Sequence, residues 1–297
     1  MSERILAIDG NSILNRTYYA IPWLTNTRGE TVHGVIGFFN ILLKNIKIYQ
    51  PTSICVAFDV SRHTFRTDFY PEYKATRRKT PNELIEQLGI LKDILNEMGI
   101  ECYEQENFEA DDILGTIATY ADENNHECYI LTGDKDDLQL ASDNVSIILV
   151  VTKSGDAVDT LMTASDILDK YGVTPAQFID AKAIMGDSSD NIPGVKGLAE
   201  KTAMELIAEY KTLDNVYANL DNLRTRVKNL LEADKENAYK SQHLSTIIRN
   251  VPIEYLPKKF DISQIKQKNV LDKLHYYGLR SLENKLGAVE MEQISWF

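Results

Sequence analysis

Nine carboxylates occur in five short segments of the chain. They are Asp9, Asp59, Glu109, Asp111, Asp112, Asp134, Asp136, Asp187 and Asp190. Like charges about 4 Å apart repel by roughly 4 kcal/mol per pair at an effective dielectric constant near 20, so a cluster of such acids is hard to keep ionised without bound cations. Ligand sets made only of oxygen favour Mg²⁺ or Mn²⁺. The nine acids therefore predict one divalent-metal centre.

Three of these acids directly follow continuous apolar runs, which are typical of strands buried on both faces of a sheet. Asp9, Asp59 and Asp134 follow the runs 5–8, 54–58 and 129–133. A single Asp at a strand end usually caps a turn or a helix. Three strand ends with the same feature favour a shared site instead.

Helical patterns lie between the apolar runs. Apolar residues recur at helical spacing over 33–48, 80–98 and 111–121, and Thr80, Pro81 and Glu83 predict a capping box at the start of the second helix. Strands that alternate with helices indicate right-handed crossovers and a mostly parallel sheet, whose strand carboxyl ends open onto one edge. We therefore expect an α/β fold in which the strand-end acids converge at that edge.

The chain changes character after about Val173. The strand signal fades, and helical patterns recur until roughly Ile248, including 175–185 and 198–210. A further helical stretch lies near 270–286. We expect a catalytic core over residues 1–172, a helical unit over 173–250, and a C-terminal segment over 251–297 that packs back on the core.

Two of the acidic segments have alternative explanations. Glu109, Asp111 and Asp112 stand at a predicted helix start, where carboxylates stabilise the helix dipole by about 0.3–1 kcal/mol; three acids exceed that need. The run Asp-Lys-Asp-Asp over 134–137 would by itself suggest a solvated charged surface. Its position directly after an apolar run favours the metal site.

Residues 62–79 form a positive segment within a chain of net charge −12. Its cations are Arg62, Arg66, Lys74, Arg77, Arg78 and Lys79, and they alternate with Phe65, Phe69, Tyr70 and Tyr73. Basic residues interleaved with aromatic rings suit single-stranded nucleic acid, because rings stack on bases and cations follow phosphates. The alternative is a mobile surface loop. The negative net charge of the whole chain would by itself argue against a polyanionic partner. The local positive segment is the stronger evidence, and it favours such a partner.

A glycine-rich turn follows the last acids. Gly194 and Gly197 stand three apart after Pro193, with Lys196 in the turn and Lys201 early in the next predicted helix. Glycines allow backbone amides to approach a phosphate closely, and the two lysines would help to hold an anion. A purely structural turn between two helices is the alternative.

The composition suits a soluble globular protein, with 43% hydrophobic and 26% charged residues among 297. The longest apolar runs are too short to cross a bilayer, so we expect no membrane partner. We expect a cytoplasmic location. Cys55, Cys102 and Cys128 are odd in number and widely spaced, which suits reduced thiols rather than disulfides or a zinc site.

Taken together, these segments resemble the 5′-nuclease family, which includes the N-terminal 5′→3′ exonuclease domain of bacterial DNA polymerase I and the flap endonucleases. The matching stretches are Ile8-Asp9-Gly10, Ala57-Phe58-Asp59, Glu109-Ala110-Asp111-Asp112, Thr132-Gly133-Asp134-Lys135-Asp136, Gly186-Asp187-Ser188-Ser189-Asp190-Asn191 and Pro193-Gly194-Val195-Lys196-Gly197. The resemblance covers nearly the whole chain.

The resemblance implies a PIN-like nuclease core and a helix-3-turn-helix unit that grips duplex DNA. It implies one metal site at Asp9, Asp59, Glu109, Asp111 and Asp112, and a second at Asp134, Asp136, Asp187 and Asp190. A helical arch over about 61–82 would carry Lys74 and Arg77 as catalytic cations and Arg62, Arg66, Tyr73, Arg78 and Lys79 as DNA contacts. The turn would bind DNA through Gly194, Lys196, Gly197 and Lys201.

The implied function is structure-specific 5′→3′ exonuclease and flap endonuclease cleavage of DNA in replication and repair. Two Mg²⁺ or Mn²⁺ ions would stabilise the attacking and leaving oxygens of the phosphodiester. A monomer would bind nicked or branched duplex DNA with a 5′ single-stranded flap, with K⁺ as a candidate ion at the turn. Ala199 stands where the family usually has a glycine. The alternatives are a DNA-binding protein of the same fold with weak or no hydrolysis, and a PIN-type ribonuclease.

No polymerase or proofreading domain follows in this sequence. The resemblance therefore implies a stand-alone bacterial 5′-nuclease, or a fragment of a longer protein.

Overall fold

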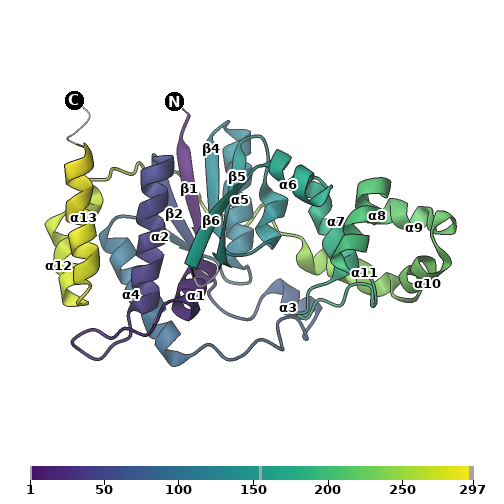
Figure 1. Ribbon diagram of the computed structural model, residues 1–297, viewed down its shortest axis with the longest axis horizontal. Helices are drawn as coiled ribbons and strands as arrows, with labels where there is room; N and C mark the ends of the chain where they lie inside the picture. The colour runs from purple at the N-terminus through teal and green to yellow at the C-terminus, as the bar shows by residue number, and fades with distance from the viewer. Residues whose placement is uncertain (1, 154–155, 294–297) are drawn as a thin grey trace.

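A six-stranded sheet forms the centre of the computed structural model, which describes residues 2–153 and 156–293 (Figure 1). The strands are β1 (Arg4–Asp9), β2 (Ser53–Phe58), β3 (Glu101–Glu104), β4 (Glu127–Thr132), β5 (Val145–Lys153) and β6 (Asp156–Met162). They lie in the order β3-β2-β1-β4-β5-β6, and all neighbours are parallel except β5 and β6. The predicted mostly parallel α/β fold is confirmed.

Helices cover both faces of the sheet. One face carries α1 (Gly10–Ala20), α2 (His33–Tyr49) and α4 (Asn82–Glu97), and the other carries α5 (Ala110–Glu123). In α5, Ile113, Leu114 and Ile117 are fully buried because they recur on one helical stripe. The central strands are buried on both sides, as their unbroken apolar sequences predict.

A helical unit extends from one end of the sheet (Figure 1). It contains α6 (Ala164–Tyr171), α7 (Pro175–Met185), α8 (Glu200–Tyr210), α9 (Leu213–Ala218), α10 (Thr225–Ala233) and α11 (Lys235–Ser245), with a short 3₁₀ helix η2 (Leu220–Asn222). α7 packs against both α8 and α11. Thr174 caps α7 and Pro175 occupies its first turn, which explains why the helix begins there.

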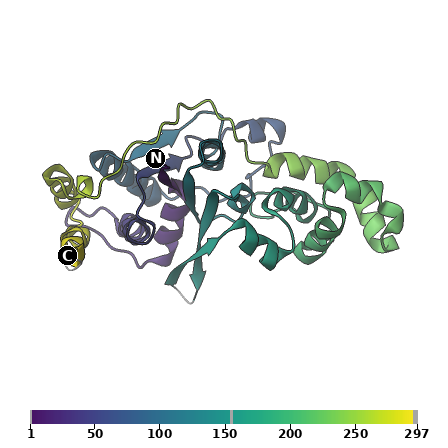
Figure 2. The same cartoon turned by 90° about the horizontal axis from the view of Figure 1, so that it is seen from above.

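The chain then returns to the opposite end of the molecule. Figure 2 shows the segment after α11 passing over the sheet towards α12 (Lys268–Tyr276) and α13 (Arg280–Gln293). On the way, the Phe260 amide donates to the Thr52 carbonyl at 2.6 Å. α12 then packs on α4 and α13 on α2, and the 3₁₀ helix η3 (Gln264–Lys266) precedes them. Residues 294–297 lie outside the described part of the chain.

Two local predictions are wrong. The helical stretch expected near 270–286 is two helices, because Gly278 adopts φ +66° and ends the first of them. The capping box expected at Thr80 does not form, since α4 begins at Asn82 and Pro81 is its N-cap residue without a side-chain cap. Among the described residues, no helix is long and apolar enough to span a membrane.

Candidate metal centre and nucleic-acid interface

Asp9 and Asp59 lie at the carboxyl ends of the paired strands β1 and β2. Asp9 also caps α1, because its Oδ1 accepts a hydrogen bond from the Ser12 amide at 2.9 Å. Asp59 Oδ1 accepts from the Ala110 amide at 2.8 Å, which ties the second strand end to the start of α5. The strand topology thus brings these two acids to the edge where α5 begins.

Asp9 and Asp111 meet a third acid, Asp137, at this edge. One carboxylate oxygen from each lies within 4.8 Å of the other two. Asp137 is on the 3₁₀ helix η1 (Asp136–Leu140) that follows β4, and its side chain is fully buried. Sequence reasoning placed Asp137 in the charge run 134–137 but not among the ligands. The available signal was its position directly after Asp136.

Burial and mutual repulsion raise the pKa values of these acids. Burial is the main cause for Asp9, with the charges of Asp59 and Asp134 adding to it, and the pKa of Asp9 rises to about 7 despite the Ser12 hydrogen bond. The pKa of Asp111 is raised well above its usual range by burial and by Asp137. The charge of Lys74 offsets only part of this repulsion, so the site fits a divalent cation with oxygen ligands.

Glu109, the N-cap residue of α5, is held by two residues of the positive segment. Its Oε1 accepts from Lys74 Nζ at 2.8 Å, and its Oε2 accepts from the Tyr73 hydroxyl at 3.1 Å. Burial alone would raise the pKa of Glu109, but Lys74 and Arg66 outweigh burial and lower it. Lys74 thus reaches the acidic edge, whereas the Tyr73 side chain is buried and points to Glu109.

Asp112 and Arg66 form a buried ion pair. Arg66 donates to both Asp112 oxygens, at 2.7 and 2.8 Å. The same oxygens accept from the backbone amides of Glu109 and Ile248, at 3.0 and 2.8 Å, and both side chains are almost fully buried. The predicted roles of Asp112 as a metal ligand and of Arg66 as a DNA contact therefore need this ion pair to open.

Lys182 of α7 joins two of the acids predicted for the second metal site. Its ammonium lies 2.7 Å from Asp136 and 2.6 Å from Asp187. Burial raises the pKa of Asp136 to about 7 with help from Asp134, whereas Lys182 and Ser189 overcome burial and lower the pKa of Asp187 to about 2. Sequence reasoning missed Lys182, because nothing in the pattern of α7 reveals its ionic partners.

Asp190, the last predicted ligand, pairs with Arg77, whose Nε donates to it at 2.9 Å. The Lys74 amide also donates to the Asp190 carbonyl at 2.8 Å. The backbone of Lys74 adopts φ +56°. Residues other than Gly, Asn and Asp rarely take this conformation. The positive segment is thereby anchored to the acid-bearing loop after α7 through both backbone and side chains.

The other predicted cations of the positive segment face solvent. Arg62, Arg78 and Lys79 are exposed, and the Arg62 guanidinium donates to the Arg78 carbonyl at 2.9 Å. Residues 65–69 form the short helix α3, and Phe69 is 52% exposed. Exposed cations and an exposed ring remain available here to a polyanion.

The glycine-rich turn between α7 and α8 is closed by backbone contacts. A Cβ atom on Gly194 would lie 2.5 Å from the Gly186 amide nitrogen, and both glycines have positive φ. The amides of Gly194, Val195 and Lys196 already donate to Ser241 Oγ, the Ile184 carbonyl and Asp234 Oδ2. The expectation that these amides meet a phosphate does not fit this arrangement, because each already has a partner.

Gly197 and the side chains of Lys196 and Lys201 are exposed at the same turn. Ala199 has φ −93° and ψ 166° at the start of α8. This is ordinary extended backbone, so alanine fits there without strain. The turn thus presents cations and one exposed glycine on its outer side.

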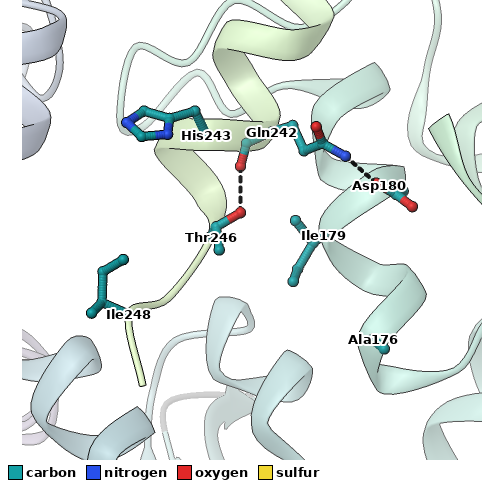
Figure 3. Close-up of a pocket in the computed structure, with 7 residues that line it drawn as sticks. All are labelled: Ala176, Ile179, Asp180, Gln242, His243, Thr246 and Ile248. Carbon is teal, nitrogen blue, oxygen red and sulfur yellow. Dashed lines mark hydrogen bonds between the residues drawn. The ribbon is translucent and has the colours of Figure 1, made fainter. Parts of the chain in front are cut away.

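A separate hollow of about 370 Å³ lies between α7 and α11 (Figure 3). It is lined by Ala176, Ile179, Asp180, Gln242, His243, Thr246 and Ile248. Gln242 donates to Asp180 across it, and the Thr246 hydroxyl donates to the Gln242 carbonyl at 2.7 Å. Its lining includes none of the nine predicted metal ligands, so the acidic edge is a separate feature.

Comparison with known proteins extends over nearly the whole chain. A model of the 5′-3′ exonuclease N-terminal resolvase-like domain matches residues 4–172, and a model of the 5′-3′ exonuclease C-terminal SAM fold matches residues 173–268. DNA polymerase I of Bacillus subtilis is 38% identical over 298 residues, which cover 99% of this chain and 34% of that protein. DNA polymerase I of Mycobacterium tuberculosis is 40% identical over 255 residues, covering 85% and 28%. The chain spans about a third of the length of these relatives.

Solved structures share the fold. The bacteriophage T5 5′-exonuclease with bound zinc ions has a TM-score of 0.66 at 23% identity, covering 93% of this chain and 98% of that chain. The T5 flap endonuclease in complex with DNA and metal ions has a TM-score of 0.69 at 21% identity, with the same coverage. The resemblance inferred from the acidic and glycine motifs is confirmed, and the chain belongs to the 5′-3′ exonuclease family.

Proposed function

We propose that this chain is a metal-dependent 5′→3′ nuclease that cleaves DNA at 5′ flaps, nicks and 5′ ends. The observation that carries the proposal is the convergence of Asp9, Asp111 and Asp137 at the carboxyl edge of the sheet, with oxygens within 4.8 Å of one another. In the proposed division, residues 1–172 form the catalytic core, residues 173–250 the duplex-binding unit, and residues 251–297 a segment that packs on the core.

The donor set fits divalent cations. Asp9, Asp59, Glu109 and Asp111 would hold one ion, joined by Asp112 if its ion pair opens. Asp134, Asp136, Asp187 and Asp190 would hold a second. Bound Mg²⁺ or Mn²⁺ would supply Lewis-acid activation of water and of the phosphate oxygens. The raised pKa values of Asp9 and Asp136, caused mainly by burial, support this proposal because cation binding would offset their charge.

The protein's own cations orient the scissile phosphate in this proposal. Lys74 and Arg77 reach the acidic edge and pair there with Glu109 and Asp190. A phosphate that enters between them would exchange these carboxylate partners for its own oxygens. Positive charge placed in advance where negative charge develops lowers the barrier to phosphodiester cleavage.

The turn between α7 and α8 would hold duplex DNA through the sugar-phosphate backbone of the DNA. Lys196 and Lys201 are exposed there and would contact phosphates without reading sequence, which gives preference for DNA structure. The free 5′ strand would pass between the positive segment and the acids. A potassium ion at the turn, a monomeric state and a cytoplasmic location belong to the same proposal.

The decisive test is cleavage of a 5′-flap DNA by Asp111→Asn and Asp134→Asn variants with added Mg²⁺. We expect each variant to lose at least about a hundredfold in single-turnover rate, while Asp143→Asn, which changes an exposed acid, retains the wild-type rate. Wild-type cleavage by both site variants would contradict the proposal.

Product mapping separates the remaining possibilities. Parallel reactions on a 5′ flap, a nicked duplex, single-stranded DNA and single-stranded RNA of equal length would show the balance of exonuclease and endonuclease cleavage. Preference for single-stranded RNA would favour a PIN-type ribonuclease. DNA binding without cleavage in either Mg²⁺ or Mn²⁺ would favour a DNA-binding protein of the same fold.

A further inference from the structure

Asp137 is a buried carboxylate without hydrogen bonds of regular geometry. Its relative exposure is 0%, and neither side-chain oxygen has a hydrogen bond of regular geometry, although the Thr132 hydroxyl interacts with the carboxylate. Burying an ionised carboxylate without compensation is among the most costly changes a folded protein can make. A single neutral hydroxyl does not balance this charge, so the carboxylate calls for a positively charged partner.

The position of Asp137 indicates what that partner is. One of its oxygens lies within 4.8 Å of oxygens from Asp9 and Asp111, so it faces two acids rather than a cation. An octahedral ion with ligand distances of about 2.1 Å separates neighbouring ligand oxygens by about 3 Å and opposite ones by about 4 Å. The three oxygens from β1, α5 and η1 lie within 4.8 Å of one another, so a small inward movement of their side chains would let them surround one small divalent cation.

The two lysines of the acidic edge, half-buried Lys74 and buried Lys182, form their ion pairs with acids other than Asp137. Lys74 lies 2.8 Å from Glu109, and Lys182 lies within 2.7 Å of both Asp136 and Asp187. Leu138 and Leu140, which follow Asp137 on η1, are fully buried, so the backbone that carries Asp137 is held in place by core packing. The carboxylate is thus fixed at the cluster.

We propose that Asp137 is a direct ligand of the divalent cation held by Asp9 and Asp111. This inference rests on the proposed metal-dependent function and adds a tenth acid to the nine found by sequence. Asp137 shapes the site from the side of η1, whereas Asp9 and Asp111 approach from β1 and α5. It contributes both charge and an oxygen at a fixed position.

The test measures metal binding rather than cleavage. Free Mn²⁺ is titrated by electron paramagnetic resonance against wild-type protein and the variants Asp137→Asn, Asp137→Glu, Asp111→Asn and Asp143→Asn. We expect Asp137→Asn to weaken the tightest Mn²⁺ site about tenfold or more and Asp143→Asn to leave it unchanged. Asp137→Glu keeps the charge but displaces the oxygens, so it should also weaken binding. Full affinity in Asp137→Glu would reduce Asp137 to a distant charge and overturn its role as a ligand.

Thermal denaturation provides a second measurement that also reports folding. In EDTA, Asp137→Asn should melt at a higher temperature than wild type, because it removes repulsion at the cluster. The rise in melting temperature on adding Mg²⁺ should be smaller than in wild type. Unchanged Mn²⁺ affinity in Asp137→Asn together with loss in Asp111→Asn would overturn the inference and leave the proposed function standing. Absence of Mn²⁺ binding by wild type would overturn both.

Discussion

Arg66 binds both carboxylate oxygens of Asp112, at 2.7 and 2.8 Å, immediately beside Asp111 in the sequence. It also donates to the carbonyls of Leu244 and Thr246, at 2.9 and 2.8 Å, and to Glu109 Oε2 at 3.4 Å. One guanidinium therefore connects the positive segment, the start of α5 and the end of α11. We infer that this ion pair holds the acidic edge against the helical unit.

The first prediction concerns the stability that this ion pair maintains. Arg66→Met should lower the free energy of unfolding by about 3–5 kcal/mol, because it leaves Asp112 buried without its counterion. Arg62→Met is the matched control, since Arg62 is exposed in the same segment. Urea denaturation measures both variants. The double variant Arg66→Met with Asp112→Leu should recover part of the loss, and equal stability of Arg66→Met and wild type would contradict the prediction.

The second prediction concerns Lys182, which bridges Asp136 and Asp187. Lys182→Met should lower the melting temperature in EDTA, since two acids lose their shared cation. Added Mg²⁺ should then restore more stability than it adds to wild type, because a divalent ion takes over the lost charge. Lys170→Met, at an exposed lysine of α6, should respond to Mg²⁺ like wild type. If Mg²⁺ raises the melting temperature of the two variants equally, the divalent ion does not take the position of the Lys182 ammonium.

The third prediction is a dependence of stability on pH that metal reverses. Burial and neighbouring acids raise the pKa of Asp9 and of Asp136 from 3.8 to about 7, so the folded protein retains protons that the unfolded chain has released. Their contribution to stability is therefore lost as the pH rises from about 4 through 7. The pKa of Asp187 is lowered to about 2, so its contribution is lost only at acid pH.

Melting temperatures measured between pH 5 and pH 8 check this prediction. In EDTA, Asp9→Asn should show a weaker fall with pH than wild type, because one of the proton-retaining acids is gone. With saturating Mg²⁺ the wild-type slope should turn upward, since metal binding needs deprotonated ligands. If the melting temperatures of wild type and Asp9→Asn in EDTA fall equally with pH, Asp9 does not contribute to this pH dependence.

The fourth prediction separates chemistry from DNA binding within the positive segment. Lys74→Met should reduce single-turnover cleavage of a bound 5′ flap by about 10²–10³ and change DNA affinity by less than about threefold. Lys79→Met removes an exposed charge and should weaken binding while the cleavage rate of bound DNA persists. Lys74→Arg should restore part of the rate. Equal rates for Lys74→Met and wild type would exclude Lys74 from the mechanism.

Strand topology explains why much of the acidic edge was predictable. Apolar runs identified β1, β2 and β4, and parallel strands bring their carboxyl ends to one edge. The sequence alone therefore predicts that Asp9 and Asp59 lie at the same edge of the sheet. The α/β fold and the helical unit followed from the same periodicities.

Long-range partners explain why the rest was not predictable. Arg66 belongs to a segment that looks like a basic surface, yet its partner Asp112 is 46 residues away and buries it. Lys182 likewise pairs with Asp136 across the interface of α7 and η1. Asp137 lies in a charged run whose exposure depends on the packing of η1. Composition and spacing carry no information on these contacts.

The last prediction distinguishes the two glycines of the α7–α8 turn. Gly194→Ala should destabilise the protein by at least about 2 kcal/mol, because its Cβ would lie 2.5 Å from the Gly186 nitrogen at φ +59°. Gly197→Ala has positive φ but only the Leu230 side chain nearby, at 3.5 Å, so about 1–2 kcal/mol is expected. Urea denaturation measures both. Duplex affinity, measured with folded protein, should fall more for Gly197→Ala, since Gly197 is exposed and Gly194 is buried. The opposite order of affinities would show that the buried part of the turn governs DNA binding.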